Sequence, residues 1–264
     1  MGWVSVSSVT KIAAANDYGS SWALPVGAAP PVGPFEGPSS PLNSSASADD
    51  PLWRTALSAI ETSAPQNALA DVWEGLVRGR LRPWCETTTR DRIHLIARLN
   101  RNQRGLGRGD AEFLRRVLCG EQQKVIASEL GIATSTACGR YLRALERLDF
   151  ANRPVPLPVV LAAQEWAGVA HVPSAKTVIF EHHGQHALIA SVPRPVAARL
   201  SILTPAQQEI AQCLIEGECR SEIARRRDTS VHTVARQSSS TCTRLRVGGR
   251  YALIRCAVEL HCFS

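Results

Sequence analysis

The chain has 264 residues, which is enough for one or two domains with cores of their own. Its net charge is +7, and its first 50 residues hold one basic side chain against four acidic ones, so the rest of the chain is strongly basic. A strongly basic segment of this length favours a nucleic-acid partner. No run of about 18 apolar residues occurs, which excludes a membrane-spanning helix, and no signal-peptide pattern is visible, so we expect a cytoplasmic protein.

Residues 1–50 are rich in Ser, Ala, Pro and Gly and predict a disordered tail, because such a segment cannot bury enough apolar surface to fold. Residues 51–102 predict two helices followed by a β-hairpin. Trp53 lies on the apolar face of the first helix and Trp73 on that of the second.

Two stretches predict β-hairpins, because apolar and polar residues alternate on either side of a turn. The first is residues 83–100, with its turn at Arg90 and Asp91, and the second is residues 177–190, with its turn at His183. An isolated hairpin is marginal in water, so each needs a packing partner. Either each hairpin covers its own helical unit, or the two pair into one four-stranded sheet.

Residues 111–148 predict three short helices, because apolar residues recur there at spacings of three and four and give each helix one buried stripe. The second helix includes Val125 and Leu130 in its apolar set, and the third begins at Thr134. Gly131 lies in the short turn between them. Two helices joined in this way form a helix-turn-helix.

The same stretch resembles the DNA-binding domain of LuxR-type transcriptional regulators. These residues stand at the family's spacing: Leu106, Glu112, Leu114, Gly120, Lys124, Ile126, Ala127, Leu130, Gly131, Ile132, Thr136, Arg147 and Leu148. The family's Thr-x-Arg-Glu opening is absent, and Cys138 and Gly139 stand where the family has Lys or polar residues that face the bases. The resemblance implies a helical DNA-binding unit whose fourth helix mediates pairing.

The pattern returns 97 residues later without a gap. Leu203, Glu209, Gly217, Ile223, Ala224, Thr233, Arg244, Leu245 and Arg250 repeat Leu106, Glu112, Gly120, Ile126, Ala127, Thr136, Arg147, Leu148 and Arg153. Upstream, a Trp-x-Gly pattern at Trp73 recurs at Trp166. We therefore predict two copies of one module, each with a short Trp-bearing helix end, a hairpin and a helix-turn-helix unit.

The two copies differ in their predicted cores. Thr204 is expected to cap the first helix of the second copy, and Pro205 suits the first helical position. Asp228 replaces the turn glycine, which a left-handed Asp tolerates at a cost of roughly 1 kcal/mol. Ser238 and Thr241 replace the first copy's inward residues, and each is expected to remove burial worth about 1–2 kcal/mol.

In a helix-turn-helix the second helix of the pair enters the major groove, and its N-terminus accepts phosphate. The predicted DNA-binding residues are Lys124, Thr134, Ser135, Thr136, Arg140, Arg143 and Arg147 in the first copy, and His232, Thr233, Arg236, Gln237 and Arg244 in the second. The hydroxyls of residues 134–136 either contact phosphate or cap the helix. Arg147 either contacts the DNA backbone or forms an internal ion pair. The basic run at residues 225–227 either adjoins the DNA or is a solvated face.

Residues 158–166 and 251–260 stand in the place of the family's fourth helix. Tyr251, Ile254 and Val258 give the second of these an apolar stripe and are the predicted dimerisation residues. Two arrangements are open: a pseudo-dimer within one chain, or a homodimer in which one unit of each chain binds DNA and the other makes contacts.

Metal or catalytic chemistry has little support. The eight cysteines include no Cys-x-x-Cys pair and predict reduced thiols without zinc. His182, His183 and His186 form either a metal site or a polar turn, and their place at a turn favours the latter. No Ser/His/Asp or Cys/His spacing suits nucleophilic catalysis. We expect no enzyme, no cofactor and no metal.

The sequence thus predicts an α+β protein, mainly α, built of two repeated modules. The expected segments are a disordered tail (1–50), N-terminal helices and the first hairpin (51–102), the first helix-turn-helix unit (103–165), a second Trp element and hairpin (166–199) and the second unit (200–264). The predicted function is sequence-specific binding of double-stranded DNA in transcription regulation, with RNA polymerase as a further candidate partner. The alternative is an interaction protein whose degenerate units bind another regulator or polymerase.

Overall fold

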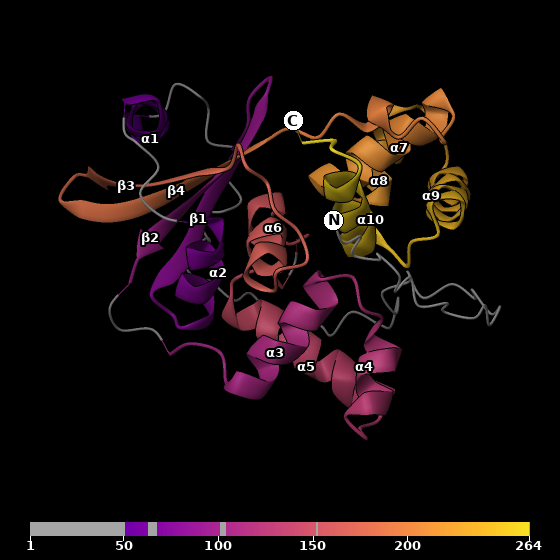
Figure 1. The fold of residues 1–264 in the computed structure, drawn as a ribbon, viewed down its shortest axis with the longest axis horizontal. Helices are drawn as coiled ribbons and strands as arrows, with labels where there is room; N and C mark the ends of the chain where they lie inside the picture. Colours follow the sequence, from indigo (N-terminus) through magenta and orange to yellow (C-terminus); the bar gives the residue numbers. More distant parts are fainter. Residues whose placement is uncertain (1–50, 63–67, 101–103, 152, 264) are drawn as a thin grey trace, which may run out of the picture. The chain divides into compact units, whose positions relative to one another are not determined.

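A computed structural model describes residues 51–62, 68–100, 104–151 and 153–263 (Figure 1). The predicted disordered tail lies outside the described residues. The described residues form an α+β fold, mainly helical, with ten α-helices and one antiparallel sheet of four strands. Among them, no helix is long and apolar enough to cross a lipid bilayer.

The two hairpins pair into one sheet, which decides between the two arrangements that the sequence left open. The strands are β1 (Leu81–Thr88), β2 (Arg92–Leu99), β3 (Lys176–His182) and β4 (Gln185–Pro193), in the order β1-β2-β4-β3. The inner strands β2 and β4 pair antiparallel, with Ile96 opposite Ile189. Residues 93–97 and 187–192 are all buried, so the inner strands need cover on both faces.

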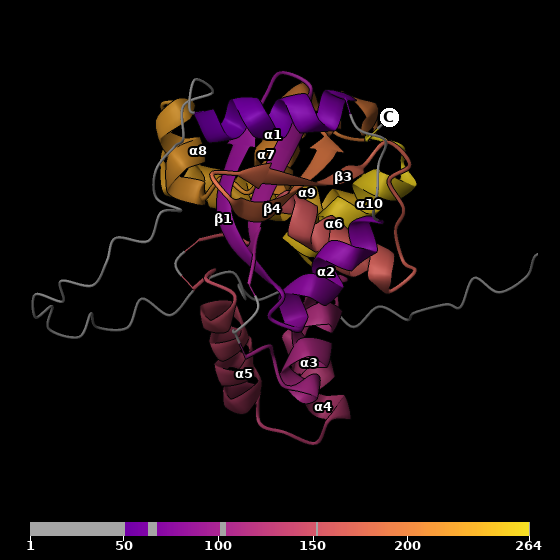
Figure 2. The ribbon, with the colours of Figure 1, turned by 90° about the vertical axis from the view of Figure 1, so that its left-hand side faces the viewer.

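Three helices provide this cover (Figure 2). Helix α1 (Pro51–Thr62) lies on one face, where Trp53 packs in a cluster with Ile96 and Ile189. Helices α2 (Leu69–Val77) and α6 (Leu157–Trp166) lie on the other face and belong to the largest core cluster. Every residue from 157 to 164 is buried, so α6 has no solvent-facing side over this length.

The first helical unit consists of α3 (Arg108–Leu118), α4 (Gln123–Glu129) and α5 (Thr134–Arg147). Its small core contains Phe113, Val117, Ile126, Ala127 and Ala137. Gly131 takes a left-handed conformation (φ +63°) in the turn before α5, as the sequence predicts. The expectation that Val125 and Leu130 join the buried stripe is wrong: they are 44 % and 47 % exposed, because α4 is only two turns long and buries Ile126 and Ala127.

The second helical unit consists of α7 (Pro205–Glu216), α8 (Arg220–Arg226) and α9 (Val231–Leu245), preceded by a short 3-10 helix (Ala197–Arg199) and followed by α10 (Arg250–Glu259). Its core contains Ile210, Cys213, Ile223, Ala224 and Val234. The Thr204 side chain accepts a hydrogen bond from the Gln207 N–H, and Pro205 is the first residue of α7, which confirms the predicted cap.

The polar substitutions in the second unit cost less than the sequence suggests. Asp228 adopts the left-handed turn itself (φ +49°). Ser238 and Thr241 are buried, but their hydroxyls donate to the Val234 and Gln237 carbonyls one turn earlier, each at 2.8 Å. A buried hydroxyl that keeps a hydrogen bond avoids most of its desolvation penalty.

Candidate nucleic-acid interface

The outer face of α5 carries a row of polar side chains, which we call the arginine stripe: Thr136, Arg140, Arg143 and Arg147. Their spacing of four, three and four residues places them on one side of the helix. The buried side of α5, about a quarter turn round the helix, holds Ala137 and Ala144, both fully buried. Thr136, Arg143 and Arg147 are exposed and Arg140 is half-buried. The packing of α5 against its unit therefore turns the stripe toward solvent.

The guanidinium groups of the stripe are available to a ligand. No residue that the structure describes forms an ion pair with Arg140, Arg143 or Arg147. For Arg147 this removes the internal ion pair, among described residues, as an alternative to a DNA contact. Two arginines of α3 behave differently, since Arg115 pairs with Glu112, and Arg116 pairs with both Glu121 and Glu129.

The hydroxyl residues at the start of α5 do not cap the helix. The N-cap residue is Ala133, whose side chain cannot accept a hydrogen bond, and Thr134, Ser135 and Thr136 are all exposed. A helix N-terminus with free hydroxyls accepts phosphate well. Lys124 of α4 is also exposed. All seven residues predicted for the first unit thus lie at or near its surface.

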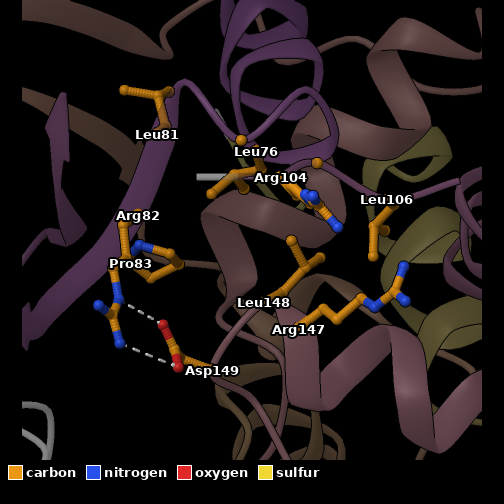
Figure 3. Close-up of a pocket in the computed structure, with 11 residues that line it drawn as sticks. Leu76, Leu81, Arg82, Pro83, Arg104, Leu106, Arg147, Leu148 and Asp149 are labelled. Carbon is orange, nitrogen blue, oxygen red and sulfur yellow. Dashed lines mark hydrogen bonds and ion pairs between the residues drawn. The ribbon is translucent and has the colours of Figure 1, made fainter. Parts of the chain in front are cut away.

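A shallow pocket continues from the C-terminal end of the stripe (Figure 3). Arg104 and Arg147 line it together with Gly105, Leu106 and Asp149. The glycine-rich segment that begins there has the composition of a linker, but the Leu106 N–H donates to the Val77 carbonyl at 2.7 Å. This hydrogen bond holds the segment at Leu106 against the end of α2, and Arg104 and Arg147 line the same pocket, which no sequence motif indicates.

The first unit is tied to the sheet on the far side of this pocket. Arg82 of β1 donates from Nε to the Asp149 carboxylate at 2.7 Å. Asp149 lies two residues after the end of α5, so this ion pair orients the end of that helix relative to the sheet. The Arg82 guanidinium also partly neutralises the Asp149 carboxylate at the pocket, although both side chains remain partly exposed.

The equivalent face of α9 is more neutral and is bonded within its own unit. The positions 97 residues after Arg140, Arg143 and Arg147 are Gln237, Ser240 and Arg244. Gln237 accepts a hydrogen bond from Arg227 at 2.7 Å. The Gln207 side chain accepts one from Arg244 at 2.9 Å and donates to the Ser240 hydroxyl at 3.1 Å.

Three of the predicted second-unit residues lie open to solvent beside this bonded face. His232, Thr233 and Arg236 are exposed, although the Thr233 N–H donates to the capping Ser230 hydroxyl at 3.0 Å. The exposed cation Arg236 stands where the first unit has Gly139. The two units therefore present different chemistry at matching positions.

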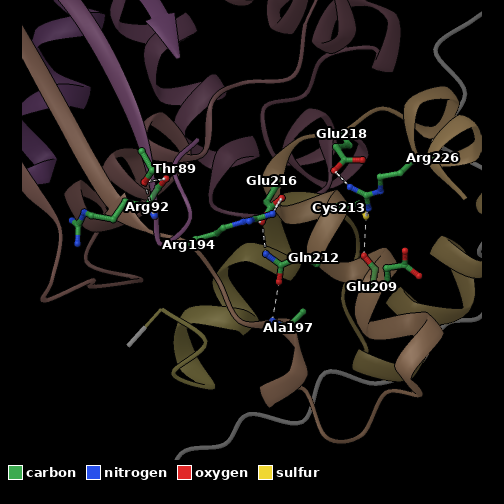
Figure 4. A network of polar contacts seen from close by, with 10 residues as sticks. All are labelled: Thr89, Arg92, Arg194, Ala197, Glu209, Gln212, Cys213, Glu216, Glu218 and Arg226. Atoms are coloured by element: carbon green, nitrogen blue, oxygen red, sulfur yellow. Dashed lines mark hydrogen bonds and ion pairs between the residues drawn. The ribbon is translucent and has the colours of Figure 1, made fainter. Parts of the chain in front are cut away.

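The basic run at residues 225–227 is mostly engaged within the second unit. Arg226 pairs with Glu218 and also contacts the Cys213 thiol (Figure 4). Arg227 pairs with Glu209 at 3.2 Å, whereas Arg225 is exposed. Burial raises the pKa of Cys213 to about 11. The thiol therefore stays protonated at pH 7 and does not act as a second anion beside Arg226.

The second unit is also tied to the sheet. Arg194, the residue after β4, pairs with Glu216 near the end of α7 at 2.5 Å. Gln212 accepts from the Ala197 N–H at 2.9 Å and donates to the same Glu216 carboxylate (Figure 4). Each helical unit thus has an ion pair to the end of a strand.

The predicted dimerisation residues lie mainly inside the protein. Ile254 is fully buried in the largest core cluster, and Tyr251 and Val258 are partly buried against it. The Ile254 side chain therefore faces the chain's own core.

The histidine turn and the cysteines show no assembled metal site. Among the described residues, no group of three or more His, Cys, Asp or Glu side chains could hold a metal ion. The rings of His182 and His183 contact each other edge to face, with centroids 4.1 Å apart. All eight cysteines lie within the described residues, and no disulfide joins them.

Comparison with known proteins gave no relative: no protein-family model matches the sequence, and neither a curated protein nor a solved structure matches the chain.

Proposed function

We propose that this chain is a sequence-specific DNA-binding transcriptional regulator that uses LuxR-type helix-turn-helix units to enter the major groove. The observation that carries the proposal is the arginine stripe of α5. It places three guanidinium groups without ion-pair partners among the described residues on the second helix of a helix-turn-helix, and that helix begins with exposed hydroxyls. Arginine side chains bind phosphate and recognise guanine, and hydroxyls at a helix N-terminus suit phosphate.

We further infer that the chain contains two copies of one module. The element order β1, β2, α3, α4, α5, α6 recurs as β3, β4, α7, α8, α9, α10. The repeat of nine residues at a fixed offset of 97 supports the same inference. A duplicated unit would explain why the helices of both units bury corresponding positions, such as Ile126 and Ile223.

A second candidate function is binding to another protein, such as a regulator or RNA polymerase. Exposed apolar residues on the first unit favour it: Val125, Leu130 and Leu142 are each more than 40 % exposed. Scattered exposed apolar residues are common on monomeric proteins, however, and three of them do not make a large patch. The cationic stripe is the more specific feature, so DNA binding is the preferred function.

The test is selection from a pool of random duplex DNA with the full chain at two salt concentrations. An enriched motif is expected, with affinity that falls steeply as salt rises. The variant Arg140→Ala/Arg143→Ala should weaken binding by about 1–3 kcal/mol for each of the two arginines that touches a base edge. The two arginines could bind phosphate instead. In that case the slope of log affinity against log salt concentration should become shallower by roughly 0.9 for each phosphate that is no longer neutralised.

The matched control is Arg54→Ala/Arg90→Ala, which removes the same charge from exposed sites on α1 and on the β1–β2 turn. It should retain the motif and nearly all of the affinity. Retention of DNA without an enriched motif, weakened equally in both double variants, would mean only a basic surface. Absence of any retention would favour the protein-binding alternative.

A further inference from the structure

The structure points to a single chain that supplies both halves of a DNA-binding pair, and we propose that it recognises an asymmetric duplex site in one orientation. The inference rests on the proposed function, because it assumes that the units bind DNA. It goes further in naming the class of site: two unlike half-sites bound by one chain, instead of a palindrome bound by two chains.

The first observation is that α10, from the second half of the chain, packs against the first unit. A Cβ atom added at Gly120, after α3, would lie 2.8 Å from the Ala252 backbone. Tyr141 of α5 and Tyr251 of α10 share a hydrogen bond between their hydroxyls at 2.9 Å. Backbone contact this close requires glycine, so Gly120 marks a closely fitted junction between the two halves of the chain.

The reciprocal contact joins the second unit to the segment that leads into α6. Gly217, the residue 97 positions after Gly120, would bring an added Cβ to 3.5 Å from Pro154. Arg250 donates to the Val155 carbonyl at 2.8 Å and also to the Leu214 and Ile215 carbonyls at 2.8 and 3.1 Å. The Arg250 side chain thereby fastens the end of α7 to the start of α6.

One buried amide ties α6 to the first of these junctions. Gln164 of α6 is fully buried, and its Nε2 donates to the Leu118 carbonyl at 2.8 Å and to the Tyr251 carbonyl at 3.1 Å. One side chain thus bonds the end of the first unit's α3 and the start of α10. A buried polar group with two bonds of this kind fixes how its neighbours are arranged.

These contacts occupy the helices that a second copy would need. The segment 157–164 of α6 is buried throughout, and Ile254 of α10 is fully buried. In the family that the units resemble, pairing uses the fourth helix. Here the fourth-helix positions are filled by the chain itself, so the pair of units is complete in one molecule.

The second observation is that the two recognition helices differ at matching positions, of which Gly139, Arg140 and Gln237 are half-buried and the others exposed. Ser135, Gly139, Arg140 and Arg143 of α5 correspond to His232, Arg236, Gln237 and Ser240 of α9. Arginine favours guanine and glutamine favours adenine in the major groove, because their donor and acceptor patterns differ. Two unlike helices held in one chain cannot read the same sequence twice, so the preferred site has no inverted symmetry.

The experiment combines selection from random duplexes with a mass measurement of the complex formed by the full chain and the selected duplex. The expected motif differs from its own reverse complement, and the complex contains one chain per duplex. A palindromic motif bound by two chains would overturn the inference and keep the proposed function. No enriched motif at all would overturn both.

Two matched double variants assign the halves of the motif. Arg140→Ala/Arg143→Ala should remove the base preference in one half of the motif, and His232→Ala/Arg236→Ala should remove it in the other half. Apart from the half-buried Arg140, these side chains are exposed, so the substitutions leave the core intact. A motif that the second variant leaves unchanged would contradict the inference, because only one unit would then touch the bases. The variant Gln237→Arg/Ser240→Arg, which gives α9 the arginines of α5, should move the second half-site toward the first.

Discussion

At the scale of single residues, burial decides which titratable groups respond to pH. His94 is only 2 % exposed on β2, under α1, and its ring lies edge-on to that of Trp53. Its Nδ1 has no hydrogen-bond partner among the described residues. Burial, with the nearby Arg92 charge as a smaller cause, lowers the pKa of His94 to about 4. The imidazole is therefore neutral in the folded protein at pH 7.

This gives a prediction for acid stability. Since the folded pKa lies below the unfolded value of 6.5, the unfolded chain binds the proton first. The contribution of His94 to stability should be complete above pH 6.5 and should fall by roughly 3 kcal/mol as the pH drops toward 4. Urea unfolding of the parent chain and of His94→Leu at a series of pH values isolates this contribution, because burial raises the pKa of Glu86 to about 7 and gives the parent chain an opposite trend over the same window.

The variant His94→Leu should lack this part of the pH dependence. His186→Ala, at an exposed position near the start of β4, is the control and should behave as the parent chain does. Equal acid sensitivity in the parent and His94→Leu would show that His94 does not become charged on unfolding in this range.

At the scale of elements, an amphipathic pattern identifies a buried face without saying what covers it. The apolar stripe of α10 is also typical of a dimer surface, and the structure packs it against α3, α6, α7 and α9. The same holds for ion pairs: the spacing of Arg116 and Glu129, on two different helices, gives no sign that they meet. Both contacts depend on the angle at which helices cross.

Truncation of α10 side chains tests whether this helix packs in the chain's own core or forms a dimer surface. Ile254→Ala should lower the free energy of unfolding by about 2–5 kcal/mol, because it leaves a cavity in the core. Leu260→Ala, at a position 47 % exposed near the end of α10, should change it little. Chemical denaturation gives both values. If Ile254→Ala instead keeps its stability and changes the molecular mass in solution, α10 contacts a second copy.

At the scale of the whole molecule, the described segments are joined by the β2–β4 pairing and by the junctions around Gly120 and Gly217. Both glycines have φ of +92°, so alanine is strained equally at the two sites. The spaces around them differ. A Cβ at Gly120 would meet the Ala252 backbone at 2.8 Å, whereas a Cβ at Gly217 would first meet the end of the Arg250 side chain at 3.0 Å.

This difference predicts unequal effects of one substitution. Gly120→Ala should destabilise the chain more than Gly217→Ala, because α10 would have to move away from α3 while Arg250 can shift. The strain common to both, roughly 1 kcal/mol, cancels in the comparison. Thermal unfolding of the two variants measures the difference. Equal destabilisation would mean that the Gly120 junction yields as easily as the Arg250 side chain.

Local patterns in the sequence are enough to locate most of the helices and strands. Alternating patterns located both hairpins, three-and-four spacing located the helices of both units, and Thr204 and Pro205 located the start of α7, because these signals depend on neighbours along the chain. Strand β1 begins at Leu81, two residues before the predicted hairpin, because local patterns locate the ends of elements only to within about two residues.

Tertiary structure alone decided which elements pair. Either hairpin arrangement satisfies the alternation of β2 and β4, and only cover by α1 on one face and by α2 and α6 on the other makes the four-stranded sheet favourable. In the same way, the sequence identified Arg140, Arg143 and Arg147 as candidate DNA contacts. Only the packed structure shows that these guanidinium groups have no ion-pair partner among the described residues. Arg116 and Arg226, by contrast, pair with carboxylates from other segments. Contacts between distant segments depend on the relative placement of whole elements, which no local pattern encodes.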